Sequence, residues 1–191
     1  MSDTLHYKPT YGHLHGNRFP YNYLYKADVT ELLEAVFSII IKTQKYSIEP
    51  FFRGFMNCMW RRAIDDGCPR PMNMAIDEMI DSLEDNCPEI FVPATPDDFH
   101  ADGVYKMDPL LAGWIGGKYN EMQYYLNIPS SVIYDLYPLD TMLKVFPALH
   151  TIDDLLAVEK MVKGVNAELK RRGQPEIDLS ACDFCRSEER R

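Results

Sequence analysis

The chain has 191 residues, which is close to the size of one domain and enough to enclose a hydrophobic core. Hydrophobic residues make up 46% of it and charged residues 26%, a balance that argues against intrinsic disorder and against a fibrous repeat. The formal net charge of −9 is concentrated in residues 65–102, where eleven acidic residues occur with one basic residue, Arg70. Because a negative surface repels phosphate groups, we expect no binding to nucleic acid.

Neither a membrane span nor an export signal is predicted. The longest apolar stretch, residues 36–41, is interrupted by Ser38 and is too short to cross a bilayer. The first residues, MSDTLHYK, lack the apolar segment of a signal peptide. Five cysteines, an odd number, fit reduced thiols better than a disulfide framework. We therefore expect a cytoplasmic protein with no membrane association.

The first predicted helices follow an N-terminal arm, residues 1–29, in which aromatic residues are interspersed with glycine and proline and show no helical period. Thr30 is expected to cap a first helix, because apolar residues recur after it at helical spacing. Ser47 is expected to cap a second helix that runs to Trp60. This second helix is apolar on nearly every side, which is typical of the middle of a bundle.

A break at residues 67–69 precedes a third predicted helix, over residues 71–86. One face of this helix is apolar, and the opposite face carries five acids: Asp77, Glu78, Asp81, Glu84 and Asp85. These acids could steer a basic partner toward the protein, or they could simply solvate an exposed helix face. Residues 87–107 contain three prolines and several acids, which predicts a connector with a short extended segment at residues 90–92.

Four helices are predicted in the second half of the chain. The pair Asp108–Pro109 is typical of a helix start, since aspartate caps the first turn and proline fits inside it. Thr151 is expected to cap the last helix, which ends at Gly173 after a basic turn. In chain order we expect these helices over residues 108–126, 130–137, 138–146 and 151–173, with Ser130 as the cap of the second.

Together these elements predict an all-α protein, a bundle of six or seven helices without an internal repeat. The two helical halves would form either one compact body or two docked units. The predicted divisions are an aromatic arm (1–29), an N-terminal helical half (30–86), a Pro-rich acidic connector (87–107), a C-terminal helical half (108–173) and a polar tail (174–191).

The tail contains Cys182 and Cys185 in a CxxC motif, which is the most specific candidate for a metal site. Two thiolates at this spacing can bind one zinc ion, but a structural zinc site needs four ligands. A redox role is disfavoured because the motif does not lie beside a βαβ pattern. We expect free cysteines and no cofactor, with zinc as the alternative. The remaining zinc ligands would then come from His6, His13, His15, Cys68 or Cys87.

Gly113, Gly116 and Gly117 lie inside a predicted helix and not in a phosphate-binding loop. Each interior glycine costs about 1 kcal/mol relative to alanine, so a close backbone approach should offset that cost. Either another helix of this chain or a partner helix could occupy the glycine face. Trp114, between these glycines, belongs either to an interface or to the edge of the core.

Residues 128–161 resemble a known family. The segment IPSSVIYDLY (residues 128–137) is followed by LKVFPALHT (residues 143–151) and an apolar helix. This order is similar to that of a small uncharacterised bacterial domain family whose members are encoded beside predicted ADP-ribosyltransferase-like toxins. The resemblance implies an antitoxin or immunity protein and leaves residues 1–107 without a counterpart. The matching positions are Phe146, Leu149, His150 and Thr151.

His150 stands just before the expected cap of the last helix, where it could pack against the preceding helix with one ring nitrogen bonded to the backbone. Catalysis or contact with a ligand is the alternative. Carboxylates are plentiful, but no pair of them lies in a motif that demands acid–base catalysis.

We therefore predict a non-catalytic acidic interaction protein, of the antitoxin, immunity or phage–host conflict class, whose partner is a protein with a basic surface. A zinc-stabilised regulatory or adaptor module is one alternative. An enzyme with a site between the helical halves, lined by His150 and tyrosines, is another. The sequence does not predict the oligomeric state. The candidate partner-binding residues are Asp77, Asp81, Glu84, Gly113, Gly117, Trp114 and His150.

Overall fold

The structure, a computed structural model, describes residues 26–66 and 68–179. These residues form helices and no strand; two isolated β-bridges pair Tyr46 with Pro93 and Phe99 with Tyr105. The predicted all-α class is therefore confirmed. Across the same residues, no helix has the length and apolar character that crossing a membrane requires.

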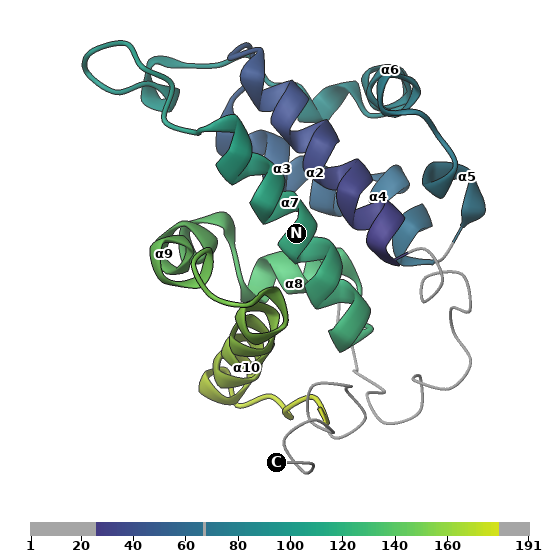
Figure 1. The fold of residues 1–191 in the computed structure, drawn as a ribbon, viewed down its shortest axis with the longest axis vertical. Helices are drawn as coiled ribbons and strands as arrows, with labels where there is room; N and C mark the ends of the chain where they lie inside the picture. The colour runs from purple at the N-terminus through teal and green to yellow at the C-terminus, as the bar shows by residue number, and fades with distance from the viewer. Residues whose placement is uncertain (1–25, 67, 180–191) are drawn as a thin grey trace, which may run out of the picture.

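Helices α2 (Lys26–Lys42) and α7 (Pro109–Leu126) lie side by side and make the most extensive contact between any two elements (Figure 1). The predicted start of α7 is confirmed, because the Asp108 carboxylate accepts a hydrogen bond from the Leu110 N–H at 2.8 Å. At its other end the helix closes at Asn127, which has a left-handed backbone. One helix from each predicted half thus forms the central pair.

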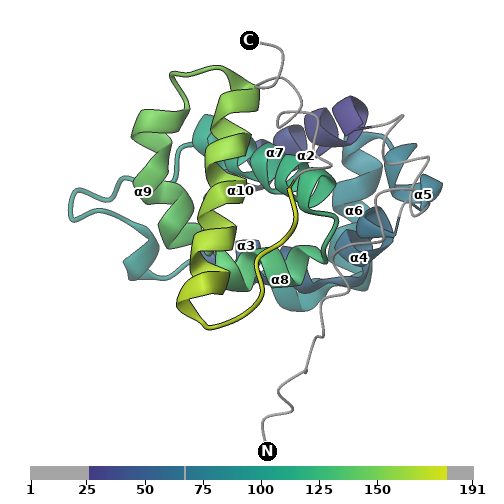
Figure 2. The ribbon, with the colours of Figure 1, turned by 90° about the horizontal axis from the view of Figure 1, so that it is seen from below.

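The remaining helices surround this pair, as Figures 1 and 2 show. The elements between residues 48 and 98 lie around α2, and the three helices that follow residue 129 lie near α7. In chain order they are α3 (Ile48–Asn57), α4 (Met59–Asp65), α5 (Pro69–Met72), α6 (Ile76–Asn86), the 3-10 turns η1 (Pro88–Ile90) and η2 (Pro96–Asp98), α8 (Ser130–Leu136), α9 (Leu139–Leu149) and α10 (Asp154–Arg171).

The buried apolar side chains form one cluster that draws on both helical halves. Near its centre, the ring of Phe37 from α2 packs edge-on against Phe51, Phe52 and Phe55 of α3, with centroids 4.8–5.2 Å apart. Such pairs contribute about 0.5–1.5 kcal/mol beyond the area they bury. The apolar segment that contains these rings lies inside the bundle, as its composition predicts.

Two predicted helices are each split in two, which raises the number of helices above the expected six or seven. Cys58 has an extended backbone and separates α3 from α4, so residues 47–60 are not one helix. The Cys58 sulfur accepts a hydrogen bond from the Arg61 N–H, which caps α4. The third predicted helix is likewise divided into α5 and α6, and its acids all belong to α6.

Two predicted caps are wrong. Helix α2 already includes Lys26, and Thr30 lies inside it, where its hydroxyl donates to the Lys26 carbonyl at 2.8 Å. Helix α10 is capped by Asp153 in place of Thr151, because the Asp153 carboxylate accepts from the N–H of Leu155 at 3.0 Å. Aspartate and threonine are both good caps, so spacing alone did not separate them.

Two other serines expected as caps make no side-chain capping bond, although Ser47 does occupy the predicted cap position of α3. The hydroxyl of Ser47 donates to the Asp98 carboxylate at 2.6 Å, which ties the connector to the start of α3. The Ile48 N–H donates to the same carboxylate at 2.9 Å. Ser130 is the first residue of α8, whose cap position is occupied by Pro129. The extended segment predicted at residues 90–92 lies two residues later, because it is residues 92–94 that pair with residues 45–47.

The first residues of the predicted polar tail pack on the bundle. Ile177 is buried, and its backbone N–H and carbonyl both bond to the side chain of Asn166 at 2.8 Å. An amide that satisfies both backbone groups of one residue holds this segment against α10. Composition alone predicts solvent exposure here, because Ile177 is one apolar residue in a polar stretch.

A buried polar network joins four helices. The Arg61 side chain is 0% exposed, and its Nε lies 3.1 Å from the Asp65 carboxylate and 2.6 Å from the Ser130 hydroxyl. Asp65 also accepts a hydrogen bond from the Ser130 N–H at 2.7 Å, an N–H that has no partner within α8 because it lies in the first turn. Asn120 of α7 accepts from the Arg61 Nη1 at 3.2 Å and donates to Thr30 of α2 at 3.0 Å.

Removing one member of this buried ion pair is expected to cost more than removing both. Asp65→Leu leaves the Arg61 charge buried without its counterion and should destabilise the protein by about 3–5 kcal/mol. The double variant Arg61→Met with Asp65→Leu removes both charges and should lose less than Asp65→Leu alone. Urea unfolding of the wild type, Asp65→Leu, Arg61→Met and the double variant measures this coupling. A double variant that loses as much stability as Asp65→Leu alone would contradict it.

Candidate functional site

The crossing of α2 and α7 is tight because α7 presents glycine to α2. A Cβ atom on Gly113 would lie 2.8 Å from the backbone oxygen of Glu34, which is closer than real Cβ contacts allow. The Ser38 side chain occupies the remaining space and donates to the Pro109 carbonyl at 2.8 Å. At Gly117 the space is filled by the side chain of Glu34. The structure thus places a helix of this chain on the glycine face.

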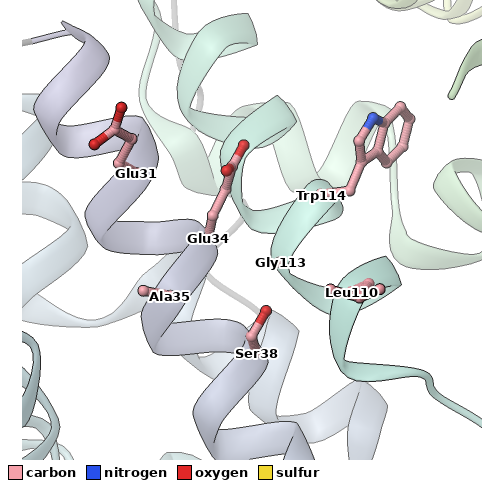
Figure 3. Close-up of a pocket in the computed structure, with 7 residues that line it drawn as sticks. All are labelled: Glu31, Glu34, Ala35, Ser38, Leu110, Gly113 and Trp114. Carbon is pink, nitrogen blue, oxygen red and sulfur yellow. The ribbon is translucent and has the colours of Figure 1, made fainter.

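An open groove of about 430 Å³ lies along this crossing. Figure 3 shows Glu34 on the side of α2 and the Trp114 indole on the other side, with Gly113 between them. Gly113 and the Ser38 side chain that fills the space beside it form the floor of the groove. Acidic, apolar and aromatic side chains therefore border one site. The lining residues are Glu31, Glu34, Ala35, Ser38, Leu110, Gly113 and Trp114.

Carboxylates outnumber cations at the end of the groove near Gly117. The Lys118 ammonium is almost fully buried and lies 2.6 Å from Glu121 and 2.9 Å from Asp154. Burial lowers the pKa of Lys118, but the hydrogen bonds with these two acids raise it overall, so the ammonium remains charged. Lys118 is therefore paired with two carboxylates other than that of Glu34.

Glu34 is half-buried beside this cluster. Burial raises the pKa of Glu34 above its ordinary value; Glu121, Asp154 and Glu31 raise it further, and Lys118 lowers it. The attraction of one shared ammonium does not compensate for partial burial and three neighbouring acids. The ionised Glu34 carboxylate is thus held in an environment that disfavours its charge.

The aromatic wall of the groove is supported by α9. The Trp114 indole packs edge-on against Phe146, with centroids 5.1 Å apart, and the His150 ring stacks on Phe146 at 4.3 Å. The Nδ1 atom of His150 lies 2.7 Å from the Phe146 carbonyl. His150 does not line the groove; it contacts Trp114 indirectly, through Phe146. Leu110, one turn before Trp114, is 81% exposed.

The other predicted interaction residues lie apart from the groove. Asp77, Asp81 and Glu84 are exposed on α6, opposite its buried Met79 and Leu83. No residue of α6 lines the groove. The acidic segment is also less exposed than its composition indicates, since two of its eleven acids, Asp65 and Asp98, are buried.

The cysteines of the described residues do not form a metal site. Cys58 and Cys87 are buried and free, and burial raises the pKa of the Cys58 thiol to about 12. Within residues 26–66 and 68–179, no group of three or more histidine, cysteine or acidic side chains is arranged to hold a metal ion. Cys182 and Cys185 lie outside the described residues, so the expectation of free cysteines there, with zinc as the alternative, stays a prediction.

Comparisons with known proteins found no matching family model, no matching curated protein and no matching solved structure. The groove is therefore interpreted from its own residues. Sequence patterns identified Gly113 and Trp114 as candidates but not Glu31, Glu34 or Leu110, which lie at positions typical of an ordinary solvent-facing helix surface.

The Glu34→Gln variant should be at least as stable as the wild type at neutral pH. Because the pKa of Glu34 is raised in the folded state, the wild type loses stability as the pH rises through that pKa. The amide has the same shape without the charge, so its advantage should disappear at acidic pH. Thermal unfolding at both pH values, with the exposed Glu89→Gln as control, tests this. A lower melting temperature of Glu34→Gln at neutral pH would show that the carboxylate is stabilising.

Proposed function

We propose that the chain is a non-catalytic interaction protein that binds a basic protein partner. The observation that carries this proposal is the groove between α2 and α7, where surplus carboxylates adjoin the exposed Leu110 and the partly buried ring of Trp114. Protein interfaces commonly combine an aromatic anchor with a polar rim. A partner with basic and apolar residues on one surface would satisfy both parts of the groove.

The acids of α6 support the same proposal as a steering surface. Asp77, Asp81 and Glu84 project into solvent from one helix. Charges at the rim of an interface act mainly on the rate of encounter. In this proposal α6 accelerates the approach of a basic partner, and the groove provides the specific contact.

The resemblance to the family encoded beside predicted toxins supports the antitoxin or immunity class. The segment that carries the resemblance contains Phe146, and this ring packs directly against Trp114 in the wall of the groove. We therefore take the partner to be the protein encoded by the adjacent gene, bound in the cytoplasm of a bacterium.

Co-expression with the product of the adjacent gene tests the proposal, followed by association kinetics at low and high salt. The triple variant Asp77→Lys, Asp81→Lys and Glu84→Lys should remain folded, because exposed substitutions change stability by about 0.5 kcal/mol or less each. Its association rate should fall, and its dependence on salt should weaken, because the steering charge is reversed.

The matched control reverses three exposed acids elsewhere: Asp97, Asp140 and Glu176. It changes the net charge equally, so a specific role of α6 predicts a smaller loss of rate in the control. Failure of the two proteins to form a complex would overturn the proposed function. Equal association rates of the two triple variants would show that α6 has no specific steering role.

A further inference from the structure

The Glu34 carboxylate at the groove shares the Lys118 ammonium with two other acids, Glu121 and Asp154. Hydrogen-bonded ion pairs hold this ammonium on Glu121 and Asp154, and it lies 6.0 Å from the centre of the Trp114 ring, beyond direct contact. No hydrogen bond or ion pair of Glu34 is formed within the described part of the chain. A positive group entering from solvent would therefore complete the charge balance of this site.

The geometry of the groove limits the shape of that group. Its floor is Gly113 with the Ser38 side chain beside it, and its two sides carry Glu34 and Trp114 (Figure 3). Leu110, at one end of the groove, and Ala35, on the side of α2, add apolar surface. The groove is open to solvent along its length, with a volume of about 430 Å³, so it can receive a side chain from the surface of another protein.

We propose that this groove receives an arginine side chain of the basic partner, with its guanidinium between the Glu34 carboxylate and the Trp114 indole. Guanidinium is planar and weakly hydrated, pairs with carboxylates through two parallel hydrogen bonds and stacks on aromatic rings. Its aliphatic stem would cover Leu110. The inference rests on the proposed function, because it takes the occupant to be part of a basic protein.

Binding of this cation should depend on pH. The charged groups that face Glu34 are Glu31 on α2, Lys118 and Glu121 on α7, and Asp154 on α10. Because the groove favours the protonated form of Glu34, and a guanidinium favours the ionised form, binding should release a proton near the pKa of Glu34. Affinity should therefore fall as the pH is lowered from neutral into the acidic range.

The chain offers an internal reporter for the test, since it has two tryptophans. Trp114 lines the groove, whereas Trp60 is buried and donates to the Ser82 carbonyl at 3.3 Å. Titration with N-acetyl-arginine amide, followed by NMR of the two indole N–H signals, should shift Trp114 saturably and leave Trp60 unchanged. N-acetyl-citrulline amide, a neutral molecule of nearly the same shape, should shift neither.

The Glu34→Gln variant should bind the arginine probe about tenfold more weakly, the effect of losing one charge-assisted pair. Glu176→Gln, a substitution of the same kind outside the groove, should bind like the wild type. Absence of a saturable Trp114 shift, equal shifts by citrulline, or unchanged affinity of Glu34→Gln would each overturn the inference. If the arginine probe fails while the adjacent-gene product still binds, only the arginine site is lost. If the probe binds and that protein does not, the proposed function is lost.

Discussion

The close approach of α2 and α7 at Gly113 is the constraint on which the rest of the structure depends. The backbone oxygen of Glu34 lies where a side chain at this position would begin, so only glycine permits this crossing. The same approach brings Ser38 to the Pro109 carbonyl and the Glu34 side chain over Gly117. The core and the groove therefore lie on two sides of one helix pair. Interior glycines, each unfavourable by about 1 kcal/mol in a helix, are explained by this contact.

Two charged sites in the molecule are organised in different ways. The buried Asp65 carboxylate is held by Arg61 and by two donors of Ser130, so its bonding partners all belong to the chain, although burial still raises its pKa above the ordinary value. Glu34 is only half-buried, yet it shares one occupied ammonium with other acids. A protein under selection for stability alone would replace such a carboxylate with a neutral side chain. Its presence is consistent with a binding role, because functional sites commonly retain groups that cost stability.

Sequence patterns predicted the positions of the helices more accurately than the contacts between them. Periodicity identified the long helices, and Asp108 before Pro109 marked the start of α7 correctly. The glycines indicated a tight crossing, but whether the second helix belonged to this chain required the structure. Arg61 and Asp65 are separated by more than 50 residues from their partners Asn120 and Ser130, so no local pattern revealed the network. Glu34 was missed for a related reason: its environment is created by α7 and α10, whereas its own helix gives it an ordinary surface position.

The free energy of unfolding of Gly113→Ala, measured beside Gly117→Ala, tests the central role of the crossing most directly. At Gly113 the new methyl group meets the backbone oxygen of Glu34 as well as the Ser38 hydroxyl, whereas at Gly117 it meets only atoms of the flexible Glu34 side chain. We expect Gly113→Ala to be destabilised by about 1–3 kcal/mol, the usual cost of overpacking, and Gly117→Ala to lose less. A Gly113→Ala variant that gains about 1 kcal/mol, as an unconstrained helix glycine would, would contradict the tight crossing of α2 and α7.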